Sequence, residues 1–226
     1  MKCKIIDCTQ GSAMWHEARL GRATASQAAN ILTPTGKLST SATGLIRRLA
    51  REQVCADPNE REPNAAMEWG NMQEPFARDE FRKLTKNRVI EVGFCQSLIH
   101  PALGCSPDGL IHGDNSAEIC IDELKLAQDA DGPIVAGLEI KCPQIDTHVE
   151  YLIDDVLPKK YAPQVHWSMA VTGLDVWYFM SYFPNLRSLI VKVERDEYTE
   201  KIESAALEFA ERYQSEVESI IERILP

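Results

Sequence analysis

The stretch Leu138-Glu139-Ile140-Lys141-Cys142-Pro143 decides the fold of this 226-residue chain. On a β-strand, residues two apart point to the same face, so Glu139 and Lys141 share one face while Ile140 turns into the core. A carboxylate and an ammonium on an otherwise apolar strand are not what a core strand requires. The mostly apolar run from Val135 to Ile140 is typical of a strand inside a covered sheet, so we expect a functional strand there.

An aspartate from a second stretch can join this strand. The segment Cys105-Ser106-Pro107-Asp108-Gly109-Leu110 precedes it, and we expect Asp108 to come from a preceding strand. Asp108, Glu139 and Lys141 together can hold a hard divalent cation through oxygen ligands and steady a water or an anion beside it. The alternative interpretation of the spacing alone is a charged strand edge.

The length of 226 residues indicates one large domain or one domain with an appendage, and we expect a single domain over residues 1–226. Its 44% hydrophobic residues are enough to form a core. No apolar run approaches the roughly 18–20 residues of a membrane span, and the N-terminus has no apolar signal segment. The seven cysteines form no C-x-x-C pair, so we expect neither a disulfide framework nor a zinc or iron–sulfur site. The expected compartment is a reducing cytosol.

The charge is unevenly distributed along the chain. The net charge of −10 argues against a protein that simply coats nucleic acid. Residues 1–55 carry eight Lys/Arg against three Asp/Glu, whereas residues 194–226 carry four against ten. This pattern fits a protein that admits a polyanion at one place only, although uneven charge is also common in other soluble proteins.

The order of the expected elements predicts an α/β (α+β) fold, with a mixed sheet flanked by helices. Turn residues separate the strands, and hydrophobic residues recur every three or four positions in the helices. The expected strands are 89–94, 96–99, 104–106 with 110–111, 119–124, 135–141, 176–182 and 189–193. The expected helices are 42–55, about 74–83, about 161–171 and an acidic C-terminal helix over about 199–225.

A possible anion site lies near the N-terminus. Thr24 or Ser26 is a natural N-cap for a short helix through Ile31. A serine hydroxyl and free amides at a helix N-terminus bind anions, and the nearby Arg19 would complete a phosphate pocket. The simpler alternative is that Ser26 only caps the helix.

Six motifs in order give the chain a specific resemblance. It resembles the bacteriophage lambda exonuclease family, the YqaJ-like viral recombinase exonucleases of the PD-(D/E)XK nuclease superfamily, from Trp15 to about Glu197. The motifs are Trp15-His16-x-x-Arg19-Leu20-Gly21-x-x-Thr24-Ala25-Ser26, Trp69-Gly70-x-x-x-Glu74, Cys105 to Leu110, Leu138 to Pro143, Gln164-Val165-x-x-Ser168-Met169 and Val193-Glu194-Arg195-Asp196-Glu197.

The resemblance implies a restriction-endonuclease-like core and a processive 5′→3′ exonuclease on double-stranded DNA ends. Such an enzyme depends on Mg²⁺, for which Mn²⁺ substitutes, releases 5′-mononucleotides and leaves a 3′ single strand. It also implies a homotrimeric ring that works beside a single-strand annealing protein in phage recombination. The expected location is the cytoplasm of a bacterial host cell, as a phage or prophage protein.

The family motifs also imply a role for each candidate residue. Asp108 and Glu139 would be metal ligands together with the Ile140 carbonyl, and Glu74 would ligate a second ion. Two ions suit phosphodiester hydrolysis, because they stabilise both the attacking and the leaving oxygen. Lys141 would orient the attacking water, and Gln164 would be the active-site glutamine of the family. Arg19, Ser26 and Ser106 would form a pocket for the 5′-phosphate. Met67 would be an apolar wedge that splits the last base pair, for which plain core packing is the alternative.

One feature departs from the family. Thirty residues separate Asp108 from Glu139, roughly twenty more than in the compact family pattern, and they contain a second Glu-x-Lys at Glu123 and Lys125. We assign Glu139 as the ligand because Cys142-Pro143 follows it and an apolar run precedes it, as in the family that the chain resembles. Glu123 then belongs to an inserted surface hairpin at about 114–134.

Two other functions remain open. A PD-(D/E)XK endonuclease would share the metal site but lack a 5′-phosphate pocket. A non-catalytic scaffold for DNA recombination would lack one of the site residues. The histidines show no ligand spacing; we expect structural packing for His166 and a possible DNA contact for His148.

Overall fold

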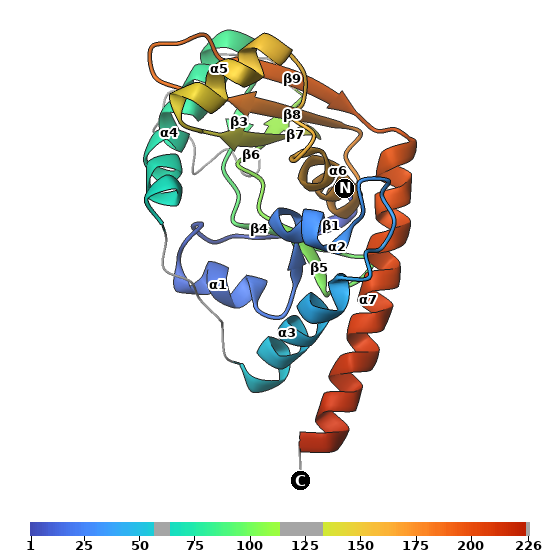
Figure 1. Cartoon of the computed structure of the whole chain (residues 1–226). Coiled ribbons are helices and arrows are strands. Elements are labelled where there is room, and N and C mark those ends of the chain that lie inside the picture. Colours follow the sequence, from blue (N-terminus) through green and yellow to red (C-terminus); the bar gives the residue numbers. More distant parts are fainter. Residues whose placement is uncertain (57–63, 114–132, 225–226) are drawn as a thin grey trace.

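The computed structural model describes residues 1–56, 64–113 and 133–224, and their strands form two sheets (Figure 1). The predicted mixed α/β fold is confirmed, but two sheets replace the single expected one. The four-stranded sheet has the order β1 (Cys3–Ile6), β4 (Phe94–Ser97), β5 (Leu103–Cys105), β2 (Ala23–Thr24). The five-stranded sheet has the order β3 (Val89–Ile90), β6 (Gly109–His112), β7 (Ile134–Lys141), β8 (Val176–Ser181), β9 (Leu189–Glu194).

The chain crosses between the two sheets at two described places. The strand expected over residues 89–94 is split, because β3 joins one sheet and β4 joins the other. Gly93 lies at this crossing, where an added Cβ would come within 2.2 Å of the Cys8 carbonyl oxygen, so the close approach requires glycine. The second crossing, from β5 to β6, is the segment that contains Ser106 and Asp108. The candidate aspartate therefore lies at the junction of the sheets.

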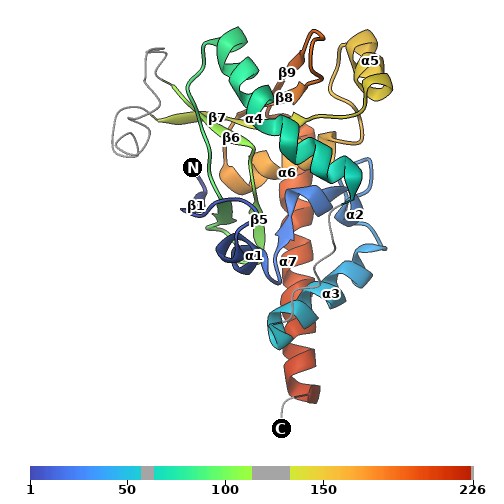
Figure 2. The same cartoon turned by 90° about the vertical axis from the view of Figure 1, so that its left-hand side faces the viewer.

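The helices surround the sheets, and one of them lies between them. They are α1 (Ala13–Arg19), α2 (Ala28–Ile31) after a 3-10 turn (Ala25–Gln27), α3 (Ala42–Cys55), α4 (Ala65–Thr85), α5 (Ile145–Asp154), α6 (Ala162–Thr172) and α7 (Glu197–Ile224). Helix α6 contacts strands of both sheets and lies at the centre of the molecule in Figures 1 and 2. Pro163 and all residues from Val165 to Thr172 are buried, the polar His166, Ser168 and Thr172 included, as expected for a helix that is covered on nearly all sides.

Helix α4 begins at Ala65, earlier than the expected start near Glu74. The Asn64 side chain caps it by accepting a hydrogen bond from the Met67 N–H at 3.0 Å. Pro75, which is solvent-exposed, lies inside the helix without ending it. The helix turns Glu74 inward, one turn before the buried Arg78.

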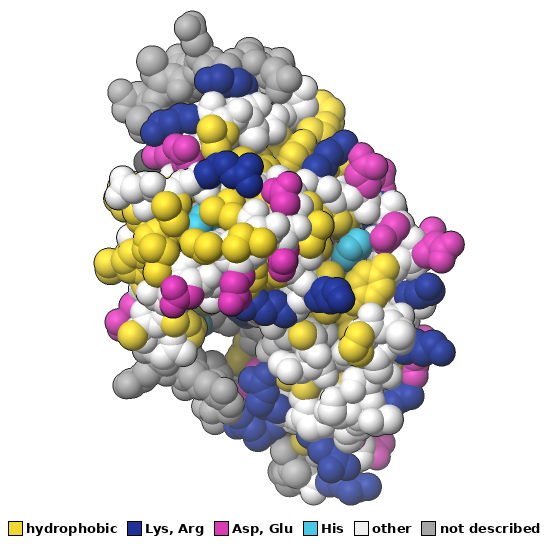
Figure 3. Space-filling model, turned by 45° about the horizontal axis from the view of Figure 1, so that its top comes forward, with side chains coloured by type: hydrophobic (Ala, Val, Ile, Leu, Met, Phe, Trp, Pro, Cys, Tyr) yellow, Lys and Arg dark blue, Asp and Glu magenta, His cyan; other side chains and the backbone are white. Residues whose placement is uncertain are grey.

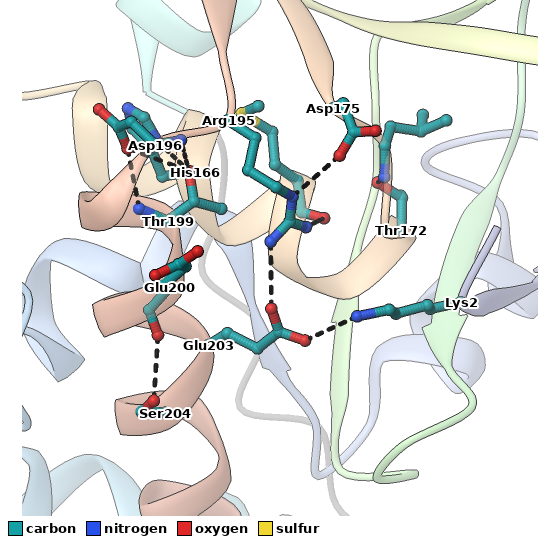
Figure 4. Close-up of polar contacts among 12 residues, drawn as sticks. Lys2, His166, Thr172, Asp175, Arg195, Asp196, Thr199, Glu200, Glu203 and Ser204 are labelled. Atoms are coloured by element: carbon teal, nitrogen blue, oxygen red, sulfur yellow. Dashed lines mark hydrogen bonds and ion pairs between the residues drawn. The ribbon is translucent and has the colours of Figure 1, made fainter.

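The acidic C-terminal helix is present as α7, which runs along α3 (Figures 1 and 2). Arg195, just before α7, fixes it to the rest of the molecule (Figure 4). Its guanidinium contacts Asp175 at 3.1 Å and Glu203 of α7 at 3.1 Å, and Lys2 also reaches Glu203 at 3.1 Å. The helix is thus tied to the ends of β1 and β8, which explains the motif around Arg195 structurally.

The predicted strand over 119–124 and the second Glu-x-Lys lie outside the described residues, as does nearly all of the proposed 114–134 insertion. The flanking residues are described. The Gly113 N–H donates to the Pro133 carbonyl at 2.9 Å, beside the end of the antiparallel β6–β7 pair. Among the helices in the described ranges, none combines the length and the apolar character needed to cross a membrane.

Candidate active site

Asp108 is held against strand β7 by main-chain hydrogen bonds. Its N–H donates to the Leu138 carbonyl at 3.1 Å, and its Oδ2 accepts from the Ile140 N–H at 2.6 Å. The Arg78 guanidinium donates to the Asp108 carbonyl at 2.8 Å. These contacts bring the Asp108 carboxylate beside the strand that carries Glu139.

Glu139 and Lys141 lie where their two-residue spacing predicts. Both are on β7, and the Lys141 ammonium forms an ion pair with the Glu139 carboxylate. The Gln164 side chain, from the central helix α6, donates to the same Glu139 oxygen at 2.5 Å. The Glu139 side chain is 2% exposed, so this polar group is enclosed by its partners. The structure therefore brings Glu139, Lys141 and Gln164 together.

Glu74 reaches the same group from α4. Its carboxylate pairs with Arg78 of the next turn, and Arg78 also contacts Glu91 at 3.0 Å. The same guanidinium binds the Asp108 carbonyl, so Arg78 links the helix that carries Glu74 to the loop that carries Asp108. Sequence reasoning gave Arg78 no role, although its four-residue spacing from Glu74 was the available signal.

The carboxylates of this group repel one another and are poorly hydrated. Burial raises the pKa of Glu139 to about 7, and the charges of Asp108 and Glu74 add to the effect. Burial and the charge of Asp108 likewise raise the pKa of Glu74 to about 7. Burial raises the pKa of Asp108 as well, against the opposing effect of Lys141. Burial lowers the pKa of Lys141, but the attraction of Glu139 and Asp108 outweighs this and raises it overall.

This donor set fits a hard divalent cation. It offers carboxylate oxygens from three residues, and a cation would offset both their burial and the repulsion that adds to the raised pKa values of Glu74 and Glu139. Within the described ranges, no three His, Cys, Asp or Glu side chains converge tightly enough to form a closed metal cluster as they stand. Asp108 is turned toward the Ile140 N–H and Glu139 toward Lys141 and Gln164.

A second polar group lies two residues before Asp108. The Ser106 hydroxyl accepts hydrogen bonds from Arg19 Nη1 at 3.1 Å and from Trp15 Nε1 at 2.9 Å. The Arg19 guanidinium lies 4.1 Å from the centre of the Trp15 ring, one turn away on α1. Burial lowers the pKa of Arg19 to about 10, which leaves it charged at neutral pH. Trp15 was not predicted as a site residue, but its four-residue spacing from Arg19 placed both on one helix face.

Other candidates take different positions. The Ser26 hydroxyl is hydrogen-bonded to Thr24 at 3.2 Å, not to the Arg19–Ser106 pair. Met67 is exposed near the start of α4, so the core alternative for it is wrong. The surface groove between Lys37 and the α7 residues Glu197 to Glu208 contains none of the predicted site residues.

Two histidines serve the fold. The fully buried His148 bonds to Ser181 Oγ at 2.8 Å and to the Arg187 carbonyl at 3.0 Å, so the predicted DNA contact is wrong. His166 Nδ1 bonds to Thr199 Oγ1 at 2.8 Å, at the start of α7 (Figure 4). The structural packing expected for His166 is what the structure has.

Comparison with solved structures supports the fold. The chain is similar to the alkaline exonuclease LHK-Exo from Laribacter hongkongensis, with 27% identity and a TM-score of 0.75 over 94% of this chain and 97% of that one. The crystal structure of LHK-Exo in complex with dAMP gives 28% identity, the same TM-score and the same coverage. A phage related exonuclease from Haemophilus somnus 129PT shares the fold at 14% identity, with a TM-score of 0.57 over 88% of this chain and 96% of that one.

The family of the chain follows from a match that extends well beyond the site residues. A search among curated proteins gave no match. The model of the YqaJ-like viral recombinase domain matches residues 14–175, which include every candidate site residue. This range covers more than half of the chain, so the chain belongs to the YqaJ-like viral recombinase family.

Proposed function

We propose that the protein is a divalent-metal-dependent 5′→3′ exonuclease that acts on double-stranded DNA ends, releases 5′-mononucleotides and leaves a 3′ single strand. The observation that carries this proposal is the gathering of Asp108, Glu139, Lys141 and Gln164 beside the Arg19–Ser106 pair. The similarity to two structures of the alkaline exonuclease LHK-Exo, one of them in complex with dAMP, supports a nuclease.

Different residues of the chain take different roles in phosphodiester hydrolysis. Asp108, Glu139 and the Ile140 carbonyl would hold Mg²⁺ or Mn²⁺, and Glu74 would hold a second ion. When bound, such ions stabilise charge on the attacking and leaving oxygens. Lys141 orients the attacking water and neutralises charge on the phosphate, because its ammonium is held beside Glu139.

Gln164 and the main chain hold this group in position. The Gln164 amide donates to Glu139 and so fixes the orientation of that carboxylate. The hydrogen bond from the Ile140 N–H does the same for Asp108. Ligands on a central strand are held more rigidly than ligands on a loop, which suits a site that must keep its geometry through repeated cleavage.

The Arg19–Ser106 pair supports action at DNA ends. A guanidinium can bind a terminal phosphate through two parallel hydrogen bonds, and the Ser106 hydroxyl adds another polar group. Ser106 and Asp108 are two residues apart, so their Cα atoms are at most about 7 Å from each other. A 5′-phosphate held there would place the next phosphodiester near Asp108, which yields single nucleotides as products. Ser26, in the 3-10 turn Ala25–Gln27, would complete the pocket on DNA binding.

The proposed assembly is a homotrimeric ring that works with a single-strand annealing protein in the cytoplasm of a bacterial host. Hydrophobic side chains gather on one part of the face in Figure 3, among charges of both signs. Helix α5 contributes an exposed apolar stripe of Ile145, Val149 and Ile153, of which Ile153 is 77% exposed. Such a stripe supports burial against another chain. Met67, exposed at the start of α4, is proposed as the wedge that meets the last base pair.

The two open alternatives predict different substrates. An endonuclease would cut a covalently closed circle and would be indifferent to a 5′-phosphate, whereas a non-catalytic scaffold would cut nothing. The test is digestion of end-labelled linear duplexes with and without a 5′-phosphate, against a closed circle, with Mg²⁺ or with a chelator. We expect Mg²⁺-dependent release of labelled mononucleotides from linear DNA and an intact circle. Cleavage of the circle, or no cleavage at all, would overturn the proposal.

A further inference from the structure

An aromatic stack lies against the candidate catalytic strand. Tyr161 occupies the N-cap position of α6, and its ring stacks on Phe179 of β8 with 5.3 Å between ring centres. Phe179 is the register partner of Glu139 in the parallel β7–β8 pair, so the ring lies next to the site. The Lys141 ammonium is 5.5 Å from the centre of the Tyr161 ring. Tyr161 therefore borders the proposed reaction centre.

A second ammonium approaches the same ring from the solvent side. Lys160 is exposed, and its Nζ lies 5.0 Å from the centre of the Tyr161 ring and 5.3 Å from that of Tyr151. Both distances are within the range in which a cation is attracted to an aromatic face. The two rings meet edge to face, with 6.3 Å between their centres. They hold a lysine that would otherwise sample many rotamers, so less entropy is lost when its ammonium binds a ligand.

The two ammonium groups differ in how their charge is compensated. Lys141 is paired with Glu139. In the part of the chain that the structure describes, Lys160 forms no ion pair with a carboxylate, and the groups that act on its charge are Tyr151 and Tyr161. It is thus an exposed, positioned cation close to the lysine assigned to the scissile phosphate, on a protein whose net charge is −10. An anion at this point gains attraction from Lys160 that most of the surface does not offer.

We propose that Lys160, held over the rings of Tyr151 and Tyr161, binds the DNA backbone phosphate next to the one that is cut. This inference rests on the proposed nuclease function. Lysine suits the role because a compact ammonium contacts a phosphate of any sequence, as an exonuclease requires. Each phosphate contact of this kind also makes binding depend on salt. For duplex DNA, log K falls as log salt rises, and each contact adds about 0.9 to the steepness of that fall.

The test is equilibrium binding of a 5′-phosphorylated duplex in EDTA, followed by fluorescence anisotropy at several salt concentrations. We expect Lys160→Gln to weaken binding by roughly 3- to 10-fold at moderate salt. The dependence of log K on log salt should become less steep by about 1. Lys160→Arg should keep the affinity within about twofold, because a guanidinium retains the charge and also packs on aromatic faces. The matched control is Lys192→Gln, which removes an exposed lysine from β9 and should leave both values unchanged.

The possible results separate this inference from the proposed function. Wild-type affinity and slope in Lys160→Gln would overturn the inference, and so would an equal loss in Lys192→Gln, which would mean a general effect of net charge. A loss in Lys160→Arg as large as in Lys160→Gln would overturn the role of the charge. If the wild-type protein failed to digest linear duplexes, the proposed function itself would fail, whatever the Lys160 variants did.

Discussion

The Asp108 carboxylate accepts a hydrogen bond from the Ile140 N–H, with 2.6 Å between the two atoms. The Asp108 N–H in turn donates to the Leu138 carbonyl. The two bonds flank Glu139, so the relative position of the two proposed metal ligands is set by main-chain geometry. A change of side-chain chemistry at Asp108 can therefore be separated from a change of fold.

The first prediction separates the chemical role of the Asp108 side chain from its role in the fold. Asp108→Asn keeps an oxygen that can accept the Ile140 N–H, so the free energy of unfolding should change by no more than about 1 kcal/mol. Cleavage of linear duplex DNA should fall by about 10³-fold or more, because a neutral amide is a poor ligand for a hard cation. Nuclease assays and urea unfolding measure the two effects. A folded Asp108→Asn protein with near-normal cleavage would show that Asp108 holds no essential metal.

The second prediction concerns the terminal phosphate. Arg19→Gln should slow digestion of 5′-phosphorylated ends by roughly 10- to 100-fold, because charge-assisted bonds to the phosphate are lost. Ends with a 5′-hydroxyl should be affected much less. The control is Arg212→Gln on the surface of α7, which should leave both substrates unchanged. Equal slowing of both kinds of end in Arg19→Gln would show that the pocket assignment is wrong.

The third prediction is a pH dependence of stability. The pKa of Glu74 is raised from its usual 4.5 to about 7 in the folded protein, so the folded state holds this proton more tightly than the unfolded state does. The favourable contribution of the protonated form is complete below about pH 4.5 and is lost as the pH rises toward 7. In EDTA, Glu74→Gln should therefore raise the free energy of unfolding by about 1–3 kcal/mol more at pH 8 than at pH 5.

Urea unfolding of wild-type and Glu74→Gln protein at both pH values tests this. Arg78 keeps Glu91 and the Asp108 carbonyl as partners in the variant, so the substitution does not leave the guanidinium unpaired. Glu211→Gln, at an exposed position of α7, should show no such difference between the two pH values. The same effect of Glu74→Gln at pH 5 and pH 8 would contradict the raised pKa.

The fourth prediction separates the two Glu-x-Lys pairs. Glu139→Ala should abolish cleavage, because Glu139 lies on β7 with Lys141 and Gln164 around it. Glu123→Ala should leave cleavage nearly unchanged, because the chain leaves the β6–β7 pair beside Gly113 and Pro133, at the end of the strands away from Asp108. A side-by-side assay at saturating Mg²⁺, with folding checked by circular dichroism, measures both. An inactive Glu123→Ala beside an active Glu139→Ala would mean that the catalytic strand is misassigned.

The fifth prediction concerns assembly. Sedimentation velocity should give a particle of about three times the 25.4 kDa chain mass, as expected for a closed ring. Ile153→Lys, in the exposed stripe of α5, should shift the protein toward smaller species because a charge replaces a buried apolar contact. Leu98→Lys, at an exposed residue outside α5, is the control. A stable wild-type monomer at micromolar concentration would overturn the trimer.

Much of the fold could be predicted from the sequence because its periodic signals are local. The apolar run before Lys141 gives β7, and the spacing of Ile202, Ala206 and Phe209 gives α7. The division into two sheets could not be predicted, since it depends on where the chain crosses between layers at Gly93 and Ser106, and no local pattern marks a crossing. The early start of α4 was missed because Pro75 is usually a helix terminator.

The sequence indicates the main residues of the candidate site but not the contacts between them. Residue type and spacing indicate Glu139 with Lys141, and family motifs indicate Asp108, Glu74 and Gln164. The hydrogen bond from Arg78 to the Asp108 carbonyl joins residues thirty positions apart and leaves no local trace, whereas the Glu74–Arg78 spacing was a local signal. Trp15 was likewise missed as a donor to Ser106, because that contact joins α1 to the crossing between the sheets.

The β6–β7 pair keeps Asp108 and Glu139 together at one end while the chain leaves and re-enters at the other, near Gly113 and Pro133. The number of residues between the aspartate and the glutamate is therefore free to vary during evolution without moving either carboxylate. A sequence search that fixes this gap would overlook relatives whose chemistry is intact. A search that fixes the pairing of Gly109 with Leu138, and leaves the gap open, would retain them.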